Sequence, residues 1–326
     1  MDAPFKLGGF AVATAAVLAL SFGVGNAIGP IGQNANNTHH EGGSDMKDTT
    51  AHGPSGHGGN AAAQPGGLMV SEHGYTLELD STFLSSGTTE VTFGITGPDD
   101  QPVTRYESTH DKDLHFIAVR RDTTGFQHVH PTMDAQGRWT TTLDLTAGVW
   151  RFYADFRPAG HDQTMTLGID AFVAGGYEPQ PIPAPAQAAQ VGEYTVTLDG
   201  HLIPGAPSEL TLAVTRGGQP VTDLQSYLAA YGHLVALRVG DLAYLHVHPD
   251  GEPDDGVTKP GPDITFVATA PSAGTYRLFL DFRHDGVVRT ADFSAQAAAQ
   301  QNAAAVPAPT HTSVTPNPGQ PDGHQH

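Results

Sequence analysis

Residues 147–157 have the sequence AGVWRFYADFR, and residues 273–283 have the sequence AGTYRLFLDFR. From the aromatic residue onward, every second residue in both segments is apolar, which is typical of a β-strand with one face toward a core. Two equivalent buried strands are therefore predicted. Their inward residues are Trp150, Phe152, Ala154 and Phe156 in the first strand, and Tyr276, Leu278, Leu280 and Phe282 in the second.

The other face of each of these strands carries charged residues next to one aromatic residue. An Asp and an Arg two positions apart on a strand face are most often a surface ion pair, which contributes about 0 to 1 kcal/mol. We therefore expect this face to meet solvent. Its residues are Arg151, Tyr153, Asp155 and Arg157 in the first strand, and Arg277, Phe279, Asp281 and Arg283 in the second.

The similarity extends along most of the chain. YTLELD at 75–80 matches YTVTLD at 194–199, and the tetrapeptide QPVT occurs at 101–104 and at 219–222. The tetrapeptide HVHP also occurs twice, and a further histidine precedes each copy by the same number of residues. The chain is therefore predicted to contain one domain twice.

Both copies alternate apolar and polar residues, with Gly, Pro or Asp at intervals typical of turns between short strands. This pattern predicts an all-β protein with two tandem β-sandwich domains, Ig-like or cupredoxin-like, at residues 68–174 and 192–295. Residues 31–67 are rich in His and Gly, residues 175–191 in Pro and Ala, and residues 296–326 in Ala, Gln and Pro. We expect these three segments to be a disordered linker, a second linker and a disordered tail.

Residues 1–30 form a separate unit. The run from Phe10 to Ile28 contains no charged side chain, and its length matches the roughly 20 residues that span a bilayer. It predicts one transmembrane helix that anchors an extracytoplasmic protein in the cell membrane. Cleavage as a signal peptide, which would give a secreted protein, remains an alternative.

The composition excludes several classes of function. With 34 acidic and 15 basic residues the net charge is −19, which disfavours a nucleic-acid partner. The chain has no cysteine, so it forms no disulfide, thiolate metal site or cysteine nucleophile. Any metal ion must be held by histidine, carboxylate or methionine side chains.

The repeated His-Val-His motif is the strongest candidate for a metal site. On a strand, its two imidazoles project from the same face, and the upstream histidine is expected on a neighbouring strand. Three imidazoles and a carboxylate suit copper or zinc, with copper favoured by the affinity order of divalent ions. One site per repeat is predicted, formed by His115, His128, His130 and Asp155, and by His233, His246, His248 and Asp281.

A structural role for these histidines is the alternative. His115 alternates with Ile117 and Val119, which is typical of a strand face in a core. Val129 would then take the inward face of the His-Val-His strand and turn its histidines outward. In that arrangement His115 and His128 point in opposite directions and share no ion.

Three segments of the second copy carry a resemblance to a known group. They are SYLAAYGHLVAL at 226–237, LHVHP at 245–249 and YRLFLDF at 276–282, and FKLGGF at 5–10 adds to them. Together they resemble actinobacterial membrane-anchored tandem β-sandwich proteins that are often labelled heavy-metal-binding. The resemblance implies a metal-binding role for His233, His246 and His248. The strand order also resembles that of cupredoxin-type copper-resistance proteins, although blue-copper chemistry needs a cysteine that this chain lacks.

We therefore expect a non-enzymatic, metal-binding protein that sequesters copper or delivers it to a metal transporter or envelope protein. One alternative is a metal-free sandwich module that binds a partner protein or acts as a scaffold. Another is a cupin-like metalloenzyme, because Gly240, the histidines at 246–248 and Glu252 match the first half of the cupin metal motif. The second half of that motif is missing.

Overall fold

The computed structural model describes residues 64–245 and 247–299, and every regular element within these ranges is a β-strand. Nothing in these ranges forms a helix that is long and apolar enough to cross a membrane. The predicted anchor at 1–30 and His246 lie outside the described residues. The same is true of most of the predicted linker at 31–67 and of the predicted tail at 296–326.

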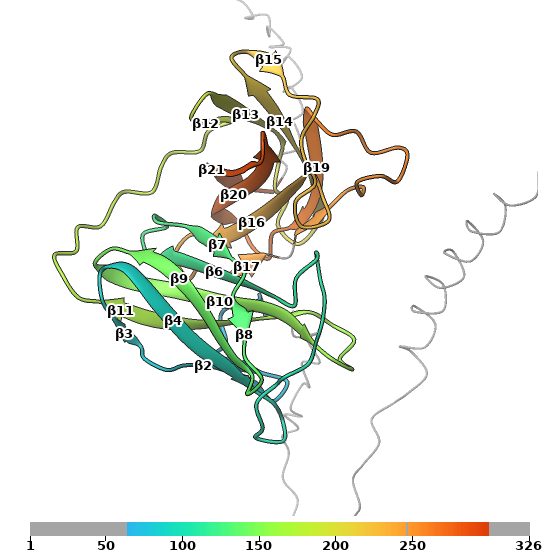
Figure 1. Cartoon of the computed structure of the whole chain (residues 1–326). Coiled ribbons are helices and arrows are strands. Elements are labelled where there is room, and N and C mark those ends of the chain that lie inside the picture. Colours follow the sequence, from blue (N-terminus) through green and yellow to red (C-terminus); the bar gives the residue numbers. More distant parts are fainter. Residues whose placement is uncertain (1–63, 246, 300–326) are drawn as a thin grey trace, which may run out of the picture. The chain divides into compact units, whose positions relative to one another are not determined.

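The first repeat consists of two sheets, and the sheet with β4 and β9 lies over the sheet with β6 and β10 (Figure 1). Neighbouring strands are antiparallel, except that β3 and β11 are parallel. One sheet has the order β1 (Ser71–Glu72), β2 (Tyr75–Leu79), β4 (Gly87–Thr96), β9 (Arg138–Leu145) and β8 (Thr132–Met133). The other has the order β3 (Phe83–Leu84), β11 (Met165–Val173), β10 (Gly148–Pro158), β6 (Leu114–Arg120) and β7 (Gln127–Val129), and β5 (Tyr106–Glu107) pairs with β10.

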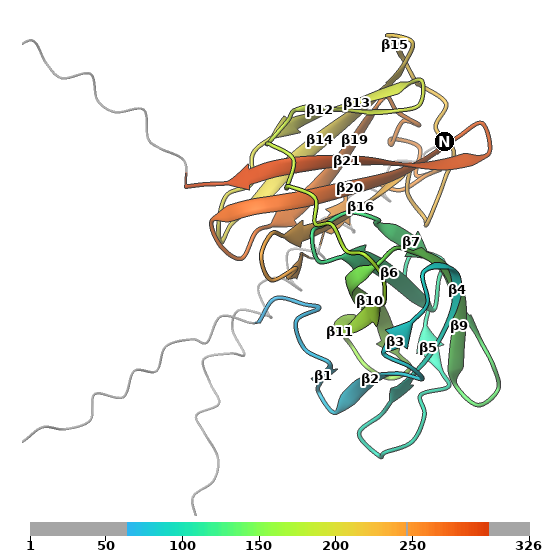
Figure 2. The same ribbon diagram turned by 90° about the vertical axis from the view of Figure 1, so that its left-hand side faces the viewer.

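The second repeat is also a pair of sheets (Figure 2). Its first sheet has the order β12 (Ala188–Val191), β13 (Tyr194–Gly200), β14 (Pro207–Arg216), β19 (Asp263–Thr269) and β18 (Val247–Pro249), and β15 (Gln219–Pro220) pairs with β14. Its second sheet has the order β17 (Tyr244–Leu245), β16 (Gly232–Arg238), β20 (Gly274–His284) and β21 (Val287–Ala297). Equivalent long strands therefore occupy equivalent places in the two repeats.

Each repeat has its own apolar core between its two sheets. The predicted inward residues of β10 and β20 are all 0% exposed, which confirms the strands and their inward faces. In the first core Phe93 of β4 stacks on Phe116 of β6, with 4.4 Å between ring centroids. The all-β sandwich predicted from the alternation of apolar residues is confirmed.

The residues on the outward faces of β10 and β20 are buried or half-buried as well, so the prediction that these faces meet solvent is wrong. Tyr153 is 0% exposed and Phe279 is 2% exposed. Both repeats lie within one compact unit, and both contribute to a third apolar cluster. That cluster consists of Ile117, Val119, Phe126 and Tyr153 from the first repeat, and of Val235, Leu237, Leu242, Tyr244 and Phe279 from the second.

Close contacts hold this interface together. Phe126 stacks on Phe279 with 4.0 Å between ring centroids and 3° between ring planes. The Tyr153 hydroxyl donates a 2.6 Å hydrogen bond to the backbone carbonyl of Leu242. One repeat therefore covers a strand face of the other, and the third cluster is a core that neither repeat has alone.

The charged residues on these faces also pair differently from the prediction. Arg151 forms an ion pair with Asp170 of the adjacent strand at 3.1 Å, and Arg277 forms one with Asp292. These cross-strand pairs leave Asp155 and Asp281 to make other contacts. Both aspartates project toward the histidines.

Candidate metal centre

Strand register places the predicted histidines on the interface between the repeats. In β6 and β10, His115 lies opposite Asp155, and in β16 and β20, His233 lies opposite Asp281. Directly opposed residues in antiparallel strands project to the same face. His115 also shares its face with Ile117, which packs in the apolar cluster between the repeats.

The same register decides the direction of His128. β7 pairs with β6 so that Val129 lies opposite Phe116, toward the core of the first repeat, and His128 lies opposite Ile117. His128 and His115 therefore point to the same side. The interpretation in which these two histidines point in opposite directions is wrong, because the face of His115 is the interface rather than the core of its own sandwich.

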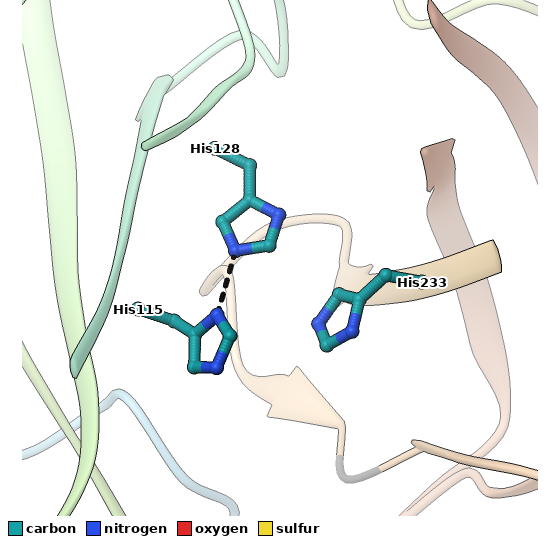
Figure 3. A group of neighbouring side chains, drawn as sticks. All are labelled: His115, His128 and His233. Carbon is teal, nitrogen blue, oxygen red and sulfur yellow. Dashed lines mark hydrogen bonds between the residues drawn. The ribbon is translucent and has the colours of Figure 1, made fainter. Parts of the chain in front are cut away.

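Three histidines meet at this interface, two from the first repeat and one from the second (Figure 3). His115, His128 and His233 each offer a ring nitrogen, and these nitrogens all lie within 4.8 Å of one another. Nδ1 of His115 is 3.1 Å from Nε2 of His128. The ring of His233 stacks on that of His115, with centroids 5.4 Å apart and planes 9° apart.

His130 extends the cluster on the side of the first repeat. Its Nε2 lies 3.2 Å from Nδ1 of His115, and its ring centroid lies 4.9 Å from that of His128. Tyr227 of the second repeat borders it, at 6.2 Å between ring centroids. All three histidines predicted for the first site therefore come together, as the internal repeat indicated.

Hydrogen bonds at the back of two rings fix where their protons lie. Nε2 of His115 is 3.0 Å from the backbone carbonyl of Thr109, and Nδ1 of His128 is 2.8 Å from Oδ2 of Asp281. A carbonyl and a carboxylate only accept hydrogen bonds, so both of these ring nitrogens carry the proton. In the neutral rings, Nδ1 of His115 and Nε2 of His128 then hold lone pairs, and these two atoms face each other.

Burial keeps the rings of His115, His130 and His233 neutral. His115 is 1% exposed, and burial, together with the nearby His128, lowers the pKa of His115 to about 3. Burial and His128 also lower the pKa of His130 to about 3, and they hold the pKa of His233 well below its usual range. Neutral imidazoles are the form that binds metal ions.

The two predicted aspartates have different partners. Asp281 accepts hydrogen bonds from His128 and, at 2.5 Å, from the hydroxyl of Thr290. Asp155 accepts one from the hydroxyl of Thr166 at 2.9 Å. Burial raises the pKa of Asp155 to about 6, although Thr166 and His128 oppose this shift. Asp281 thus contacts a histidine of the other repeat and orients it.

The second predicted set is distributed differently. His233 joins the histidines of the first repeat, so residues from both predicted sets share one cluster. His248 is exposed on β18, which pairs with β19 in the other sheet of its repeat. His246 lies outside the described residues.

His110 is a member of the cluster that sequence analysis missed. Its ring centroid lies 5.4 Å from that of His233 and 6.1 Å from that of His115. It precedes His115 in a short polar segment, which is the one signal that could have identified it. The second repeat has Leu228 at the equivalent position, so comparison of the repeats did not reveal it.

Comparison with known proteins gives a family. A family model described as a domain of unknown function, DUF8832, matches this chain twice, at residues 70–172 and at residues 189–299. No curated protein matches. The label heavy-metal-binding and an actinobacterial origin, which the resemblance implied, stay predictions.

Several solved structures are similar to the chain at low identity. The Escherichia coli adhesin FdeC is 15% identical, with a TM-score of 0.23, over 70% of this chain and 65% of that one. Domains 4 and 5 of the S-layer protein SbsC are 10% identical, with a TM-score of 0.22, over 71% of this chain and 100% of that one. The bacterial integrin-binding protein invasin is 14% identical, with a TM-score of 0.21, over 69% of this chain and 39% of that one. The chain thus spans less than two thirds of the FdeC and invasin chains, and such scores carry no conclusion about function. The match of the family model to both repeats, in contrast, covers most of the sequence, and the chain belongs to the DUF8832 family.

Proposed function

We propose that this protein binds one transition-metal ion, copper or zinc, between its repeats, with His115, His128 and His233 as ligands and His130 as a fourth imidazole. One observation carries the proposal. Nδ1 of His115 and Nε2 of His128 are 3.1 Å apart, although the hydrogen bonds behind both rings assign each of these atoms a lone pair. Two facing lone pairs at this distance repel each other unless a cation lies beside them.

The separations suit a tetrahedral site. With metal–nitrogen distances of about 2.0 to 2.1 Å, two nitrogens of a tetrahedral site lie roughly 3.3 Å apart. The separations from Nδ1 of His115 to Nε2 of His128 and to Nε2 of His130 are 3.1 Å and 3.2 Å. His233 offers a ring nitrogen within 4.8 Å of those of His115 and His128, and this nitrogen would move closer to complete the set.

A shared proton is the competing occupant of this space. In that state one imidazolium would bridge His115 and His128. Burial lowers the pKa of His115 to about 3 and so disfavours a charge on that ring, whereas His128 has the Asp281 carboxylate 2.8 Å behind it. A metal ion forms several ligand bonds at once, so it offsets the desolvation cost of a buried charge better than a proton does.

The donor set narrows the choice of metal. Imidazole nitrogen suits copper and zinc, and the affinity order of divalent ions favours Cu(II) over Zn(II). Asp281 behind His128 is the type of outer carboxylate that orients a metal-binding histidine and raises its basicity. Copper is therefore the preferred ion in this proposal.

The biological role follows from the N-terminal sequence. The uncharged run from Phe10 to Ile28 supports a membrane anchor, and the Ig-like or cupredoxin-like sandwich domains that follow it would then be extracytoplasmic. A protein in that place would sequester the ion or hand it to a transporter or envelope protein. Turnover of a substrate is not part of the proposal.

Metal titration of matched variants tests the proposal. The metal-stripped full chain is titrated with Cu(II) and with Zn(II) against a competing chelator, and is compared with the double variant His115→Ala, His233→Ala. The control is His73→Ala, His161→Ala, which removes two histidines that contact each other away from the cluster. We expect only the variant His115→Ala, His233→Ala to lose one tightly bound equivalent of metal. The three proteins share all histidines other than the four that are replaced. Equal binding by all three would contradict a site at this cluster, and no binding above background by any of them would favour a metal-free partner-binding module.

A further inference from the structure

His110 lies between the buried cluster and the surface. His115 is 1% exposed, His110 is partly buried, and the next two residues, Asp111 and Lys112, are exposed. The ring of His110 approaches those of His115 and His233 edge-on. One imidazole therefore contacts the cluster on one side and is open toward solvent on the other.

A tight turn holds His110 in this place. Thr109 and Lys112 pair across the turn, and His110 and Asp111 both have left-handed backbone conformations, with φ of 51° and 63°. The second repeat has the same turn, in which Leu228 and Ala229 both have φ of 58°. There, however, the first position is the buried Leu228. The repeats thus share the turn, and only the first uses it to present an imidazole.

A second histidine lies further out. His248 is exposed on β18 and interacts electrostatically with His110. The imidazoles therefore form a series of decreasing exposure, from the exposed His248 through the partly buried His110 to the buried His115. Each member is a possible ligand for the same ion.

From this series we infer that His110 is the entry ligand of the metal site, which binds an incoming Cu(II) or Zn(II) ion first and passes it to His115 and His233. The step is ligand exchange. The ion first exchanges a bound water for the imidazole of His110, and it then exchanges His110 for the ring nitrogens of His115 and His233. The ion keeps its oxidation state and no proton is transferred, because the rings are neutral before and after the exchange. This inference rests on the proposed function and adds a route to it.

A route differs from a binding site in its kinetics. Because loading and release follow the same path, loss of the entry ligand slows both by the same factor and leaves the equilibrium affinity unchanged. The suitable variant is His110→Asn, because Asn is among the residues that best tolerate a left-handed backbone. It removes the imidazole without straining the turn.

The matched control is His73→Asn. His73 has φ of 52°, is exposed, and has His161 rather than the cluster as its ring neighbour. His73→Asn therefore makes the same chemical change as His110→Asn, at a residue with the same left-handed backbone conformation. The two variants differ only in their distance from the proposed route.

The experiment is stopped-flow measurement of Zn(II) loading of the full chain from a fluorescent zinc indicator, and of release to an excess of chelator. For His110→Asn we expect both rate constants to fall about tenfold with an unchanged Kd, and for His73→Asn we expect wild-type rates. Unchanged rates in His110→Asn would overturn the inference, and so would a weaker Kd with unaltered loading, which would make His110 a direct ligand. A wild-type chain that takes up no ion would overturn the proposed function as well, so the two failures are distinguishable.

Discussion

Nδ1 of His128 in the first repeat lies 2.8 Å from Oδ2 of Asp281 in the second. Both side chains are almost fully buried, at 1% and 4% exposure. The bond fixes the proton of His128 on Nδ1 and turns the lone pair of Nε2 toward His115. A carboxylate of one repeat therefore prepares a ligand of the other.

Replacement of Asp281 by Asn tests this relationship. The amide keeps the shape of the side chain, but it accepts a weaker hydrogen bond, and its NH2 group must face either His128 or Thr290. We expect metal affinity to fall by about 10- to 100-fold while the fold is retained, as for other outer carboxylates of metal sites. Competition with a chelator measures the affinity.

Asp285→Asn is the control for that variant, because Asp285 lies in an exposed turn with φ of 51°, which Asn also adopts. Its metal affinity should equal that of the wild type. Equal affinity in Asp281→Asn would show that His128 does not depend on the carboxylate.

Acid release of the metal should occur at unusually low pH. A ring with a lowered pKa holds its own proton weakly, so a higher proton concentration is needed to displace the metal from it. Because the pKa values of His115 and His130 are lowered to about 3, we expect the release midpoint to lie well below the value of roughly 6.5 for free imidazole. Metal content after dialysis at stepped pH measures it, and a midpoint near 6.5 would contradict a buried site.

Tyr153→Phe tests the interface between the repeats. The change removes the hydroxyl that donates to the carbonyl of Leu242, in a place where Tyr153 is 0% exposed. A buried acceptor without its donor costs about 1 to 2 kcal/mol, so the free energy of unfolding should fall by that amount. Urea denaturation measures it. Tyr177→Phe, at a tyrosine that is 40% exposed, should leave stability unchanged.

Asp122 should make stability depend on pH in the acid range. Burial alone would raise its pKa, but hydrogen bonds from Arg120, from the backbone of Gln180 and from Thr124 outweigh burial and lower the pKa to about 2. A carboxyl with a lowered folded-state pKa stabilises the fold above its unfolded-state pKa, near 3.9, and this contribution is lost as pH falls from about 4 to 2.

The corresponding variant is Asp122→Asn, measured by urea denaturation at several pH values. We expect it to be less stable than the wild type by about 2 kcal/mol at pH 7 and to approach the wild type near pH 2. Asp100→Asn, an exposed position with φ of 57°, is the control. A difference that stays constant with pH would show that the ion pair of Asp122 with Arg120 is not its cause.

The strands and their inward faces were predictable because alternation is a local property of the sequence. In residues 147–157, Trp150 and Phe152 identify the core face without reference to any other segment. The outward face was assigned to solvent because the charged residues on it outnumber the apolar ones. Tyr153 and Phe279, which are large and apolar at equivalent positions, were the signal that another surface covers it.

The site was predictable only within one repeat. His115, His128 and His130 lie on strands that are paired locally, so spacing along the chain was sufficient to group them. The contributions of His233 and Asp281 depend on how the two repeats pack, which no local spacing encodes. For that reason one shared cluster appears where two separate sets were expected.

A duplicated domain usually leaves a spare copy that is free to change, because the other copy still performs the task. Here the cluster takes His115 and His128 from one copy and His233 from the other. Damage to either copy therefore removes the whole cluster, and neither is a backup for the other. In the described part of this molecule, duplication has replaced redundancy with mutual dependence.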